Sequence, residues 1–136
     1  MEQLYTLVSG VTKLANSTGT SVSTTYPDPT SVSIPLPAAW IAYAGSVPQD
    51  KIQGGVVPKQ LSLKNIFVVM VYLDNTQGQD ALINAQLPIL DAVVEAIRGV
   101  EATATKFRFN FEGQRLHSVT AARLAYEQRY SVVTYS

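Results

Sequence analysis

The segment "SLKNIFVVMVYLDN", residues 62–75, contains eight consecutive apolar side chains, from Ile66 to Leu73. Successive side chains of a β-strand point to opposite faces of its sheet, so this strand places apolar groups on both faces. A continuous apolar run between polar residues is typical of a strand that is buried on both sides. The segment therefore predicts the central strand of a sheet, and both of its faces need cover from this chain or from a partner.

The composition favours a single domain, residues 1–136, with a weakly charged surface. Hydrophobic residues make up 46% of the chain and charged residues only 15%, whereas charged residues form about a quarter of an average protein. The formal net charge is zero. There is no cysteine, which excludes disulfides, thiolate zinc sites and cysteine nucleophiles. The low charge suggests that part of the surface is covered in the working state.

The distribution of charge and apolar residues argues against two classes of partner. Residues 98–136 carry six basic and three acidic side chains, an excess too small for the dense basic face of a nucleic-acid binder. The longest apolar run is shorter than the ~20 residues that span a bilayer. The start, "MEQLYTLVSG", has no basic region before a long apolar core. We therefore expect a soluble protein that is made without export and has no membrane partner.

The N-terminal half is expected to alternate between ordered elements and loops. Apolar side chains at helical spacing predict an amphipathic helix over residues 2–15, and "AAWIAYAGSV", residues 38–47, predicts a strand. Long loops rich in proline, serine and threonine are expected at 16–37 and 48–60. The second loop has a Gly-Gly pair between prolines and lysines, so we expect it to become ordered only on assembly. The apolar face of the helix should consist of Leu4, Leu7, Val8, Val11, Leu14 and Ala15.

The segment "QDALINAQLPILDAVVEAIRG", residues 79–99, predicts the strongest helix. Asp80 suits its N-cap and Gly99 its C-terminal cap. Pro88 has no backbone N–H, so it must kink this helix or begin its second half. We expect residues 80–98 to lie in the core. Their apolar stripe should be formed by Ile83, Leu87, Leu90, Val94 and Ile97, widened by Leu82, Ile89, Val93 and Ala96.

The C-terminal third predicts two further strands and completes the expected fold. "TKFRFNFEGQRL" alternates phenylalanine with polar residues, and Glu112-Gly113-Gln114 is typical of a hairpin turn. The order of elements predicts an α+β fold, with a mixed, mostly antiparallel sheet of four to five strands and two helices packed on one face. The other face then needs a neighbouring subunit or a partner, unless the chain forms a two-sheet sandwich. In the last strand, one face should be formed by the side chains of Leu124, Tyr126, Tyr130 and Val132.

The sequence contains no recognisable arrangement of residues for catalysis or cofactor binding. His117 is the only histidine, and no orienting carboxylate or nucleophile is patterned with it. Asp91 and Glu95 lie one helical turn apart and lack the spacing of a calcium loop. The alternating phenylalanines could stack on RNA bases, but the glycine-rich context of such platforms is missing, and a core face explains them better. We therefore predict that the protein is not an enzyme and uses no cofactor or metal.

Several segments together carry a resemblance to a known family. An amphipathic N-terminal helix precedes "LPAAWIAYAGS", the strand "IFVVMVYLDN", the helix "ALINAQLPILDAVVEAIRG" and closing strands that end in "YEQRYSVVTY". This order resembles that of the tail terminator (tail completion) proteins of long-tailed bacteriophages. The similarity covers most of the chain and lies in the order of elements. Proteins of that family are small, cysteine-poor α+β proteins that form hexameric rings on the last ring of the tail tube and face the head connector.

The resemblance implies a structural protein of the virion that is assembled in the host cytoplasm. Its implied partners are itself, in a ring homo-oligomer, the tail tube protein and the head connector or neck protein, with DNA only passing through the lumen. No cofactor is implied. The alternatives are another neck or tail structural protein, and a small-molecule-binding or catalytic α+β domain. We expect contacts with neighbouring subunits or partners to involve Lys51, Gly54, Gly55, Lys59, Arg108 and Arg115.

Overall fold

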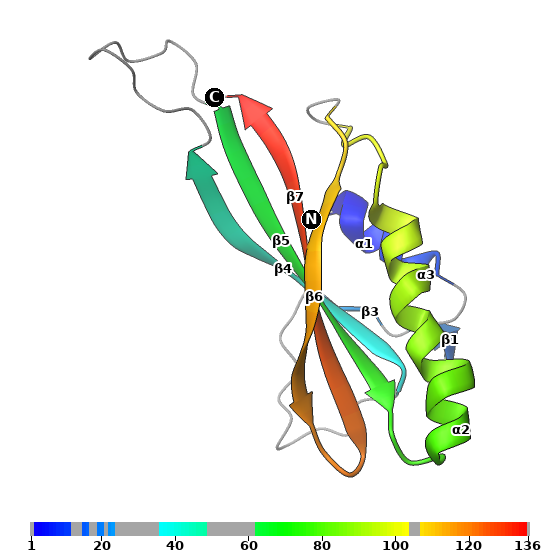
Figure 1. Ribbon diagram of the computed structural model, residues 1–136. Coiled ribbons are helices and arrows are strands. Elements are labelled where there is room, and N and C mark those ends of the chain that lie inside the picture. Colours follow the sequence, from blue (N-terminus) through cyan, green and yellow to red (C-terminus); the bar gives the residue numbers. More distant parts are fainter. Residues whose placement is uncertain are drawn as a thin grey trace.

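Figure 1 shows the computed structural model of the protein, which describes residues 2–11, 15–16, 19–20, 22–23, 36–48, 62–103 and 107–135. The long elements are α1 (Glu2–Ser9), β4 (Ala38–Pro48), β5 (Ser62–Asp74), α3 (Leu87–Ile97), β6 (Asn110–Val119) and β7 (Arg123–Tyr135). Two short segments, α2 (Gln79–Ala81) and η2 (Leu82–Gln86), lead into α3. Apart from Ala15, the short strands β1 (Ala15–Asn16), β2 (Gly19–Thr20) and β3 (Val22–Ser23) lie in the segment expected to be a loop.

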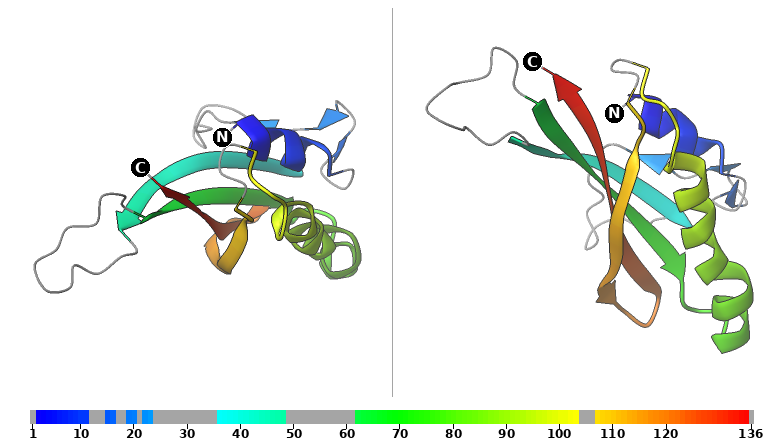
Figure 2. Two further views of the ribbon diagram at one scale, coloured as in Figure 1. Left: turned by 90° about the horizontal axis from the view of Figure 1, so that it is seen from above. Right: turned by 45° about the horizontal axis from the view of Figure 1, so that its top comes forward.

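The strand order confirms the predicted α+β class and the central position of residues 62–74. The main sheet has five strands in the order β3-β4-β5-β7-β6, and β1 pairs with β2 separately. The β4–β5, β5–β7 and β6–β7 pairs are antiparallel, whereas β3 runs parallel to β4, so the sheet is mixed as predicted. One end of β4 and β5 extends past the helices (Figure 2), and Val47, next to the last residue of β4, is exposed.

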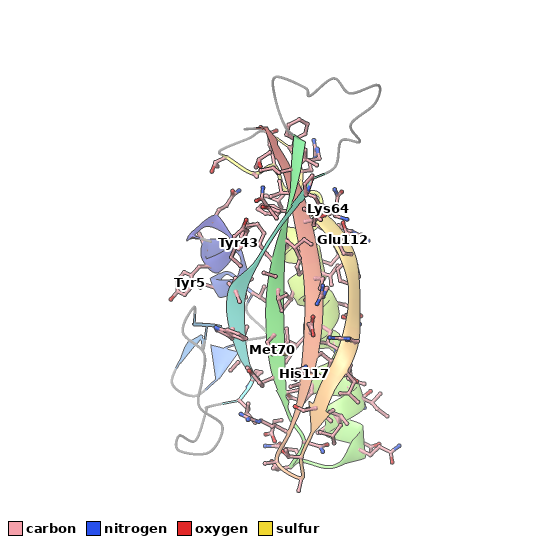
Figure 3. The ribbon with its side chains drawn as sticks, turned by 90° about the vertical axis from the view of Figure 1, so that its left-hand side faces the viewer. Tyr5, Tyr43, Lys64, Met70, Glu112 and His117 are labelled. Atoms are coloured by element: carbon pink, nitrogen blue, oxygen red, sulfur yellow. The ribbon has the colours of Figure 1, made fainter. Side chains whose placement is uncertain are left out.

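Both helices pack on the same face of the sheet, which also confirms the prediction. Figure 3 looks onto the sheet from the other side, with α1 and α3 behind it. Apolar side chains of α1, α3 and the helix-facing side of the strands form one continuous core. Its buried members are Leu4, Val8, Val11, Ala39, Ile41, Val69, Val71, Leu73, Ile89, Leu90, Val93, Ile97, Ala102, Phe109, Leu124, Tyr130 and Val132.

The first helix is shorter than predicted. It ends at Ser9, and Gly10 donates its backbone N–H to the carbonyl of Thr6 at 3.2 Å as the last turn closes. Glycine has a low helix propensity and commonly ends helices, which explains the early stop. Gly10 and Val11 are not helical and Ala15, expected in the helix, lies in β1, so the prediction was wrong at these residues; residues 12–14 lie outside the described residues. Of the predicted apolar face, Leu4, Val8 and Val11 are buried and Leu7 is partly buried, whereas Leu14 lies outside the described residues.

Pro88 lies at the start of α3, the second half of the long helix, which is one of the two outcomes predicted for it. The preceding residues Leu82–Gln86 form a π-helical turn, and the N–H of Leu87 donates to the carbonyl of Leu82. A π turn holds one residue more than an α turn, so it rotates the residues before it relative to the α3 stripe. Ile83, predicted for the core, is therefore 49% exposed, and this placement was wrong. The buried residues of α3 are Ile89, Leu90, Val93 and Ile97.

The predicted hairpin turn at residues 112–114 was also wrong. This segment lies inside β6, where the pairing with β7 shifts register between Phe111 and Gly113. Gly113 has φ 130°, a conformation that glycine adopts far more easily than other residues, so its turn-like sequence forms a β-bulge instead. The hairpin closes at residues 120–123, where the N–H of Thr120 donates to the carbonyl of Arg123 at 2.8 Å.

Candidate assembly surface

The face of the sheet opposite the helices, called the far face below, has an apolar half and an ionic half. One row of paired residues crosses both: Trp40 of β4 lies opposite Met70 of β5, Met70 opposite Glu127 of β7, and Glu127 opposite Arg115 of β6. Figure 3 shows Met70, Lys64, Glu112 and His117 on this side. Strand register therefore joins a hydrophobic strip on β4 and β5 to a charged strip on β6 and β7.

The chain itself buries part of the apolar half. A second, smaller cluster contains the buried residues Ala38, Met70, Tyr72 and Ala125, with partly buried Leu36 and Trp40 packed against it. The guanidinium of Arg123 lies 5.1 Å above the ring of Tyr72, a cation–π contact. Of the eight-residue apolar run, residues 69–73 are buried whichever face they point to. On the far face Ile66 and Val68 are only partly buried, whereas Phe67 packs against the main core on the helix side. The far face is covered by its own chain at one end of β5 and is open at the other.

Glu127 is the centre of the ionic half. Its side chain is only 7% exposed, and its Oε2 accepts hydrogen bonds from Nε and Nη2 of Arg115 at 3.2 and 3.1 Å. Its Oε1 accepts from Nε of Arg129 at 2.8 Å. Burial alone raises the pKa of this carboxyl, but the hydrogen bonds from Arg129 and Arg115 outweigh burial and leave the pKa below its ordinary value. Glu127 is therefore a fixed anion that orients two arginines.

A second carboxylate lies beside this cluster. Glu112 accepts a hydrogen bond from the hydroxyl of Ser131 and forms an ion pair with Lys64 at 3.0 Å. The hydrogen bonds from Ser131 and Lys64 hold the pKa of Glu112 below its ordinary value, against a smaller opposing effect of burial. The three side chains come from β6, β7 and β5, so this contact links three neighbouring strands through the bulge in β6.

A hollow of about 230 Å³ lies over the β6 bulge. Gly113 contributes no side chain there, and a Cβ at this position would meet no atom within 4 Å. Typical pockets for drug-sized ligands enclose roughly 300–1,000 Å³, so the hollow suits a side chain better than a metabolite. Its lining residues are Glu112, Gly113, Gln114, Arg115, Glu127 and Arg129.

His117 lies at the edge of the cluster without the geometry of a general base. Its Nδ1 is 3.9 Å from Oε2 of Glu127, which is longer than a hydrogen bond. Both oxygens of Glu127 already accept hydrogen bonds from arginine. In the described part of the chain, no group of three histidine, cysteine, aspartate or glutamate side chains is placed to hold a metal ion. Nor does any helix there have the length and hydropathy to cross a membrane.

The residues predicted to make contacts fall in different places. Arg115 belongs to the far-face cluster, whereas Nη1 of Arg108 donates to the carbonyl of Gly99 at 2.7 Å, just beyond the end of α3. Lys51, Gly54, Gly55 and Lys59 lie outside the described residues. Glu127 and Arg129 were not predicted as contact residues, although their alternation with buried Gln128 and Tyr130 in "YEQRY" places them together on the face away from the helices.

Comparison with known proteins identifies the fold but no family. No protein-family model matches this chain, and neither does any curated protein. Among solved structures, the chain matches a chain in the virion of a native gene transfer agent particle, with a TM-score of 0.62 and 16% identity. The match covers 98% of this chain and 92% of the other. This chain shares its fold with a virion protein. At this identity the likeness concerns the fold alone.

Proposed function

We propose that this protein is a structural component of a phage-type virion and acts as a tail terminator. In this role, copies of the chain form a hexameric ring that ends the tail tube and joins it to the head connector or neck protein. DNA passes through the lumen of the ring without being read. The observation that carries the proposal is the end-to-end match of this fold to a chain of a virion particle.

The far face adds independent support. Structural proteins of assemblies bury large surfaces against like neighbours, and a head-to-tail contact that closes needs no self-complementary patch. Here one end of the central strand keeps partly exposed apolar side chains beside a fixed ionic cluster. A surface with an apolar part and a polar, hydrogen-bonding part suits a protein interface. Another neck or tail component with the same fold remains the second candidate, because its interface would use the same features.

A structural role also accounts for the chemistry of the site. Glu127 is engaged by two arginines, and His117 is not within hydrogen-bonding distance of it. We therefore propose that the protein has no turnover. Hydrolysis of ester, phosphate or glycosidic substrates by the purified protein, lost on His117→Ala, would contradict this part of the proposal.

The decisive experiment is a reconstruction of the tail end of particles that contain this chain. We expect six copies related by rotation about the tail axis, between the last tube ring and the neck. Native mass spectrometry of the purified chain, alone and with tail tubes, tests whether the ring needs the tube as a template. A single isolated copy on the axis, or six copies at a different level of the neck or tail, would reject the terminator role.

A further inference from the structure

We propose that Arg115 and Arg129 on the far face bind the carboxylates of Asp91 and Glu95 from a second copy of this chain. Asp91 and Glu95 are called the acidic strip below. The inference rests on the proposed ring and names the two surfaces that meet within it. Arg115, Arg129 and the Glu127 carboxylate that they share are called the arginine cluster. Three features of the described residues support the contact: free donors at the arginine cluster, an exposed acidic strip, and the placement of the two on opposite sides of the subunit.

The arginine cluster has hydrogen-bonding capacity left over. An arginine carries five N–H donors, but Glu127 accepts from only Nε and Nη2 of Arg115 and from Nε of Arg129. The side chains of Arg115 and Arg129 are 69% and 50% exposed, so their other donors can reach a ligand. The two guanidinium groups and the Glu127 carboxylate sum to a charge of +1, and the adjacent Glu112 carboxylate is balanced by its ion pair with Lys64. The neighbouring hollow of about 230 Å³ gives room for an incoming acidic side chain.

The acidic strip has the matching chemistry. Asp91 and Glu95 are exposed on the outer side of α3, while Leu90 and Val93 face the core. Residues four apart on a helix are neighbours, with Cβ atoms about 5–6 Å apart, so the strip presents two adjacent carboxylates to two guanidinium groups. Within the described ranges no basic side chain forms an ion pair with Asp91, and Glu95 has only a 3.9 Å contact with the well-exposed Arg98. Arginine–carboxylate pairs of this kind give orientation as well as attraction.

The positions of the two surfaces determine the symmetry of the contact. The cluster lies on the far face, and α3 lies behind the sheet in the view of Figure 3. A contact between opposite sides of a subunit cannot be two-fold symmetric, so it must be head-to-tail, which builds a closed ring or a filament. Addition along the edge strand β6 is less suitable, because two irregularities, at Phe111/Gly113 and Leu116/Ser118, disturb its register.

A pair of charge-reversed proteins tests this contact. The first carries Asp91→Lys with Glu95→Lys, and the second carries Arg115→Glu, in which Arg129 still holds Glu127. Neither should form rings alone, because each brings like charges together at every interface. An equimolar mixture should form alternating rings, because each reversed surface then meets an opposite charge. Glu101→Lys, a reversal at an exposed residue outside the strip, should assemble like wild type.

The readout is native mass spectrometry with tail tubes added, and thermal unfolding checks that each variant is folded. If Arg115→Glu does not fold, Arg115→Ala is used in its place. Mixed with the Asp91→Lys, Glu95→Lys protein, it should give oligomers that contain both chains but do not close into rings. A wild-type chain that forms no ring with tubes present would overturn the ring and this contact together. If each charge-reversed variant alone forms rings as wild type does, or if their mixture stays monomeric, this contact alone would be overturned. Binding of duplex DNA that is lost in Arg115→Glu would instead assign the cluster to nucleic acid.

Discussion

Gln128 and Glu127 are neighbours on β7, both buried, and they point to opposite faces of the sheet. Gln128 faces α3: its Nε2 donates to the carbonyl of Leu90 and to Oε1 of Gln114, and its Oε1 accepts from the hydroxyl of Tyr130. Glu127 faces outward and is covered by Arg115 and Arg129, which are themselves largely exposed. Gln128 is buried by the fold, whereas Glu127 is buried by its counter-ions Arg115 and Arg129. Of the two sheet faces, only the far face therefore has charged groups that can bind another molecule.

The helix-covered face should tolerate charge least, and Leu90→Asp tests this. Leu90 is 5% exposed, and an unpaired carboxylate there loses hydration without a partner, so we expect destabilisation by about 4 kcal/mol or more. Most of the protein should then be insoluble or unfolded. Soluble yield and urea unfolding measure the effect. Ile83→Asp, at a 49% exposed position in the π-helical turn before α3, is the control and should unfold like wild type. Equal stability of the two variants would refute this assignment of the core.

The polar network on the same face should give the next largest effect. Gln128→Leu leaves the buried hydroxyl of Tyr130 without its acceptor and removes the link to the Leu90 carbonyl, which should cost about 1–3 kcal/mol. Gln114→Leu removes only an exposed partner of the same network and should cost less. Urea unfolding of the two variants compares them directly. A larger loss in Gln114→Leu would show that Gln128 is not the centre of the network.

The sequence was sufficient for features that depend on alternation and periodicity. The central strand, the two helices on one face and the order of the long elements follow from the pattern of apolar residues in the segments 2–15, 38–47, 62–75 and 79–99 and in the C-terminal third. The pattern could not reveal the π turn, because one extra residue in a turn leaves no mark in composition but moves Ile83 out of the core. The apolar pattern also could not predict the contact between Arg115 and Glu127, since that contact depends on the register of β6 around a bulge at Gly113.

The bulge that shapes the ionic half should depend on glycine at position 113. Its φ of 130° is unfavourable for residues with a Cβ, although a Cβ would meet no atom within 4 Å. Gly113→Ala should therefore cost about 1–2 kcal/mol from backbone strain alone. Gly10→Ala, where the nearest atom to the added Cβ is 3.4 Å away and φ is ordinary, serves as the control and should change stability little. Thermal unfolding that ranks the two variants in the opposite order would contradict the strain.

The smallest expected effect, about 1 kcal/mol, belongs to the charge of Glu127, because its arginine partners are well hydrated. Its pKa is lowered in the folded protein, so the ion pairs contribute stability above the ordinary value of 4.5, and this contribution is lost as the pH falls through the folded pKa. Glu127→Gln should therefore be less stable than wild type at pH 7, and the gap should close as the pH falls below 4.5 and through the folded pKa. Glu112 titrates in the same direction, so Glu112→Gln is measured in parallel to separate its contribution. Urea unfolding from pH 7 to pH 3 is the measurement. A gap between Glu127→Gln and wild type that stays constant over this range would mean that the far-face ion pairs do not stabilise the subunit, and that Arg115 and Arg129 are held by packing alone.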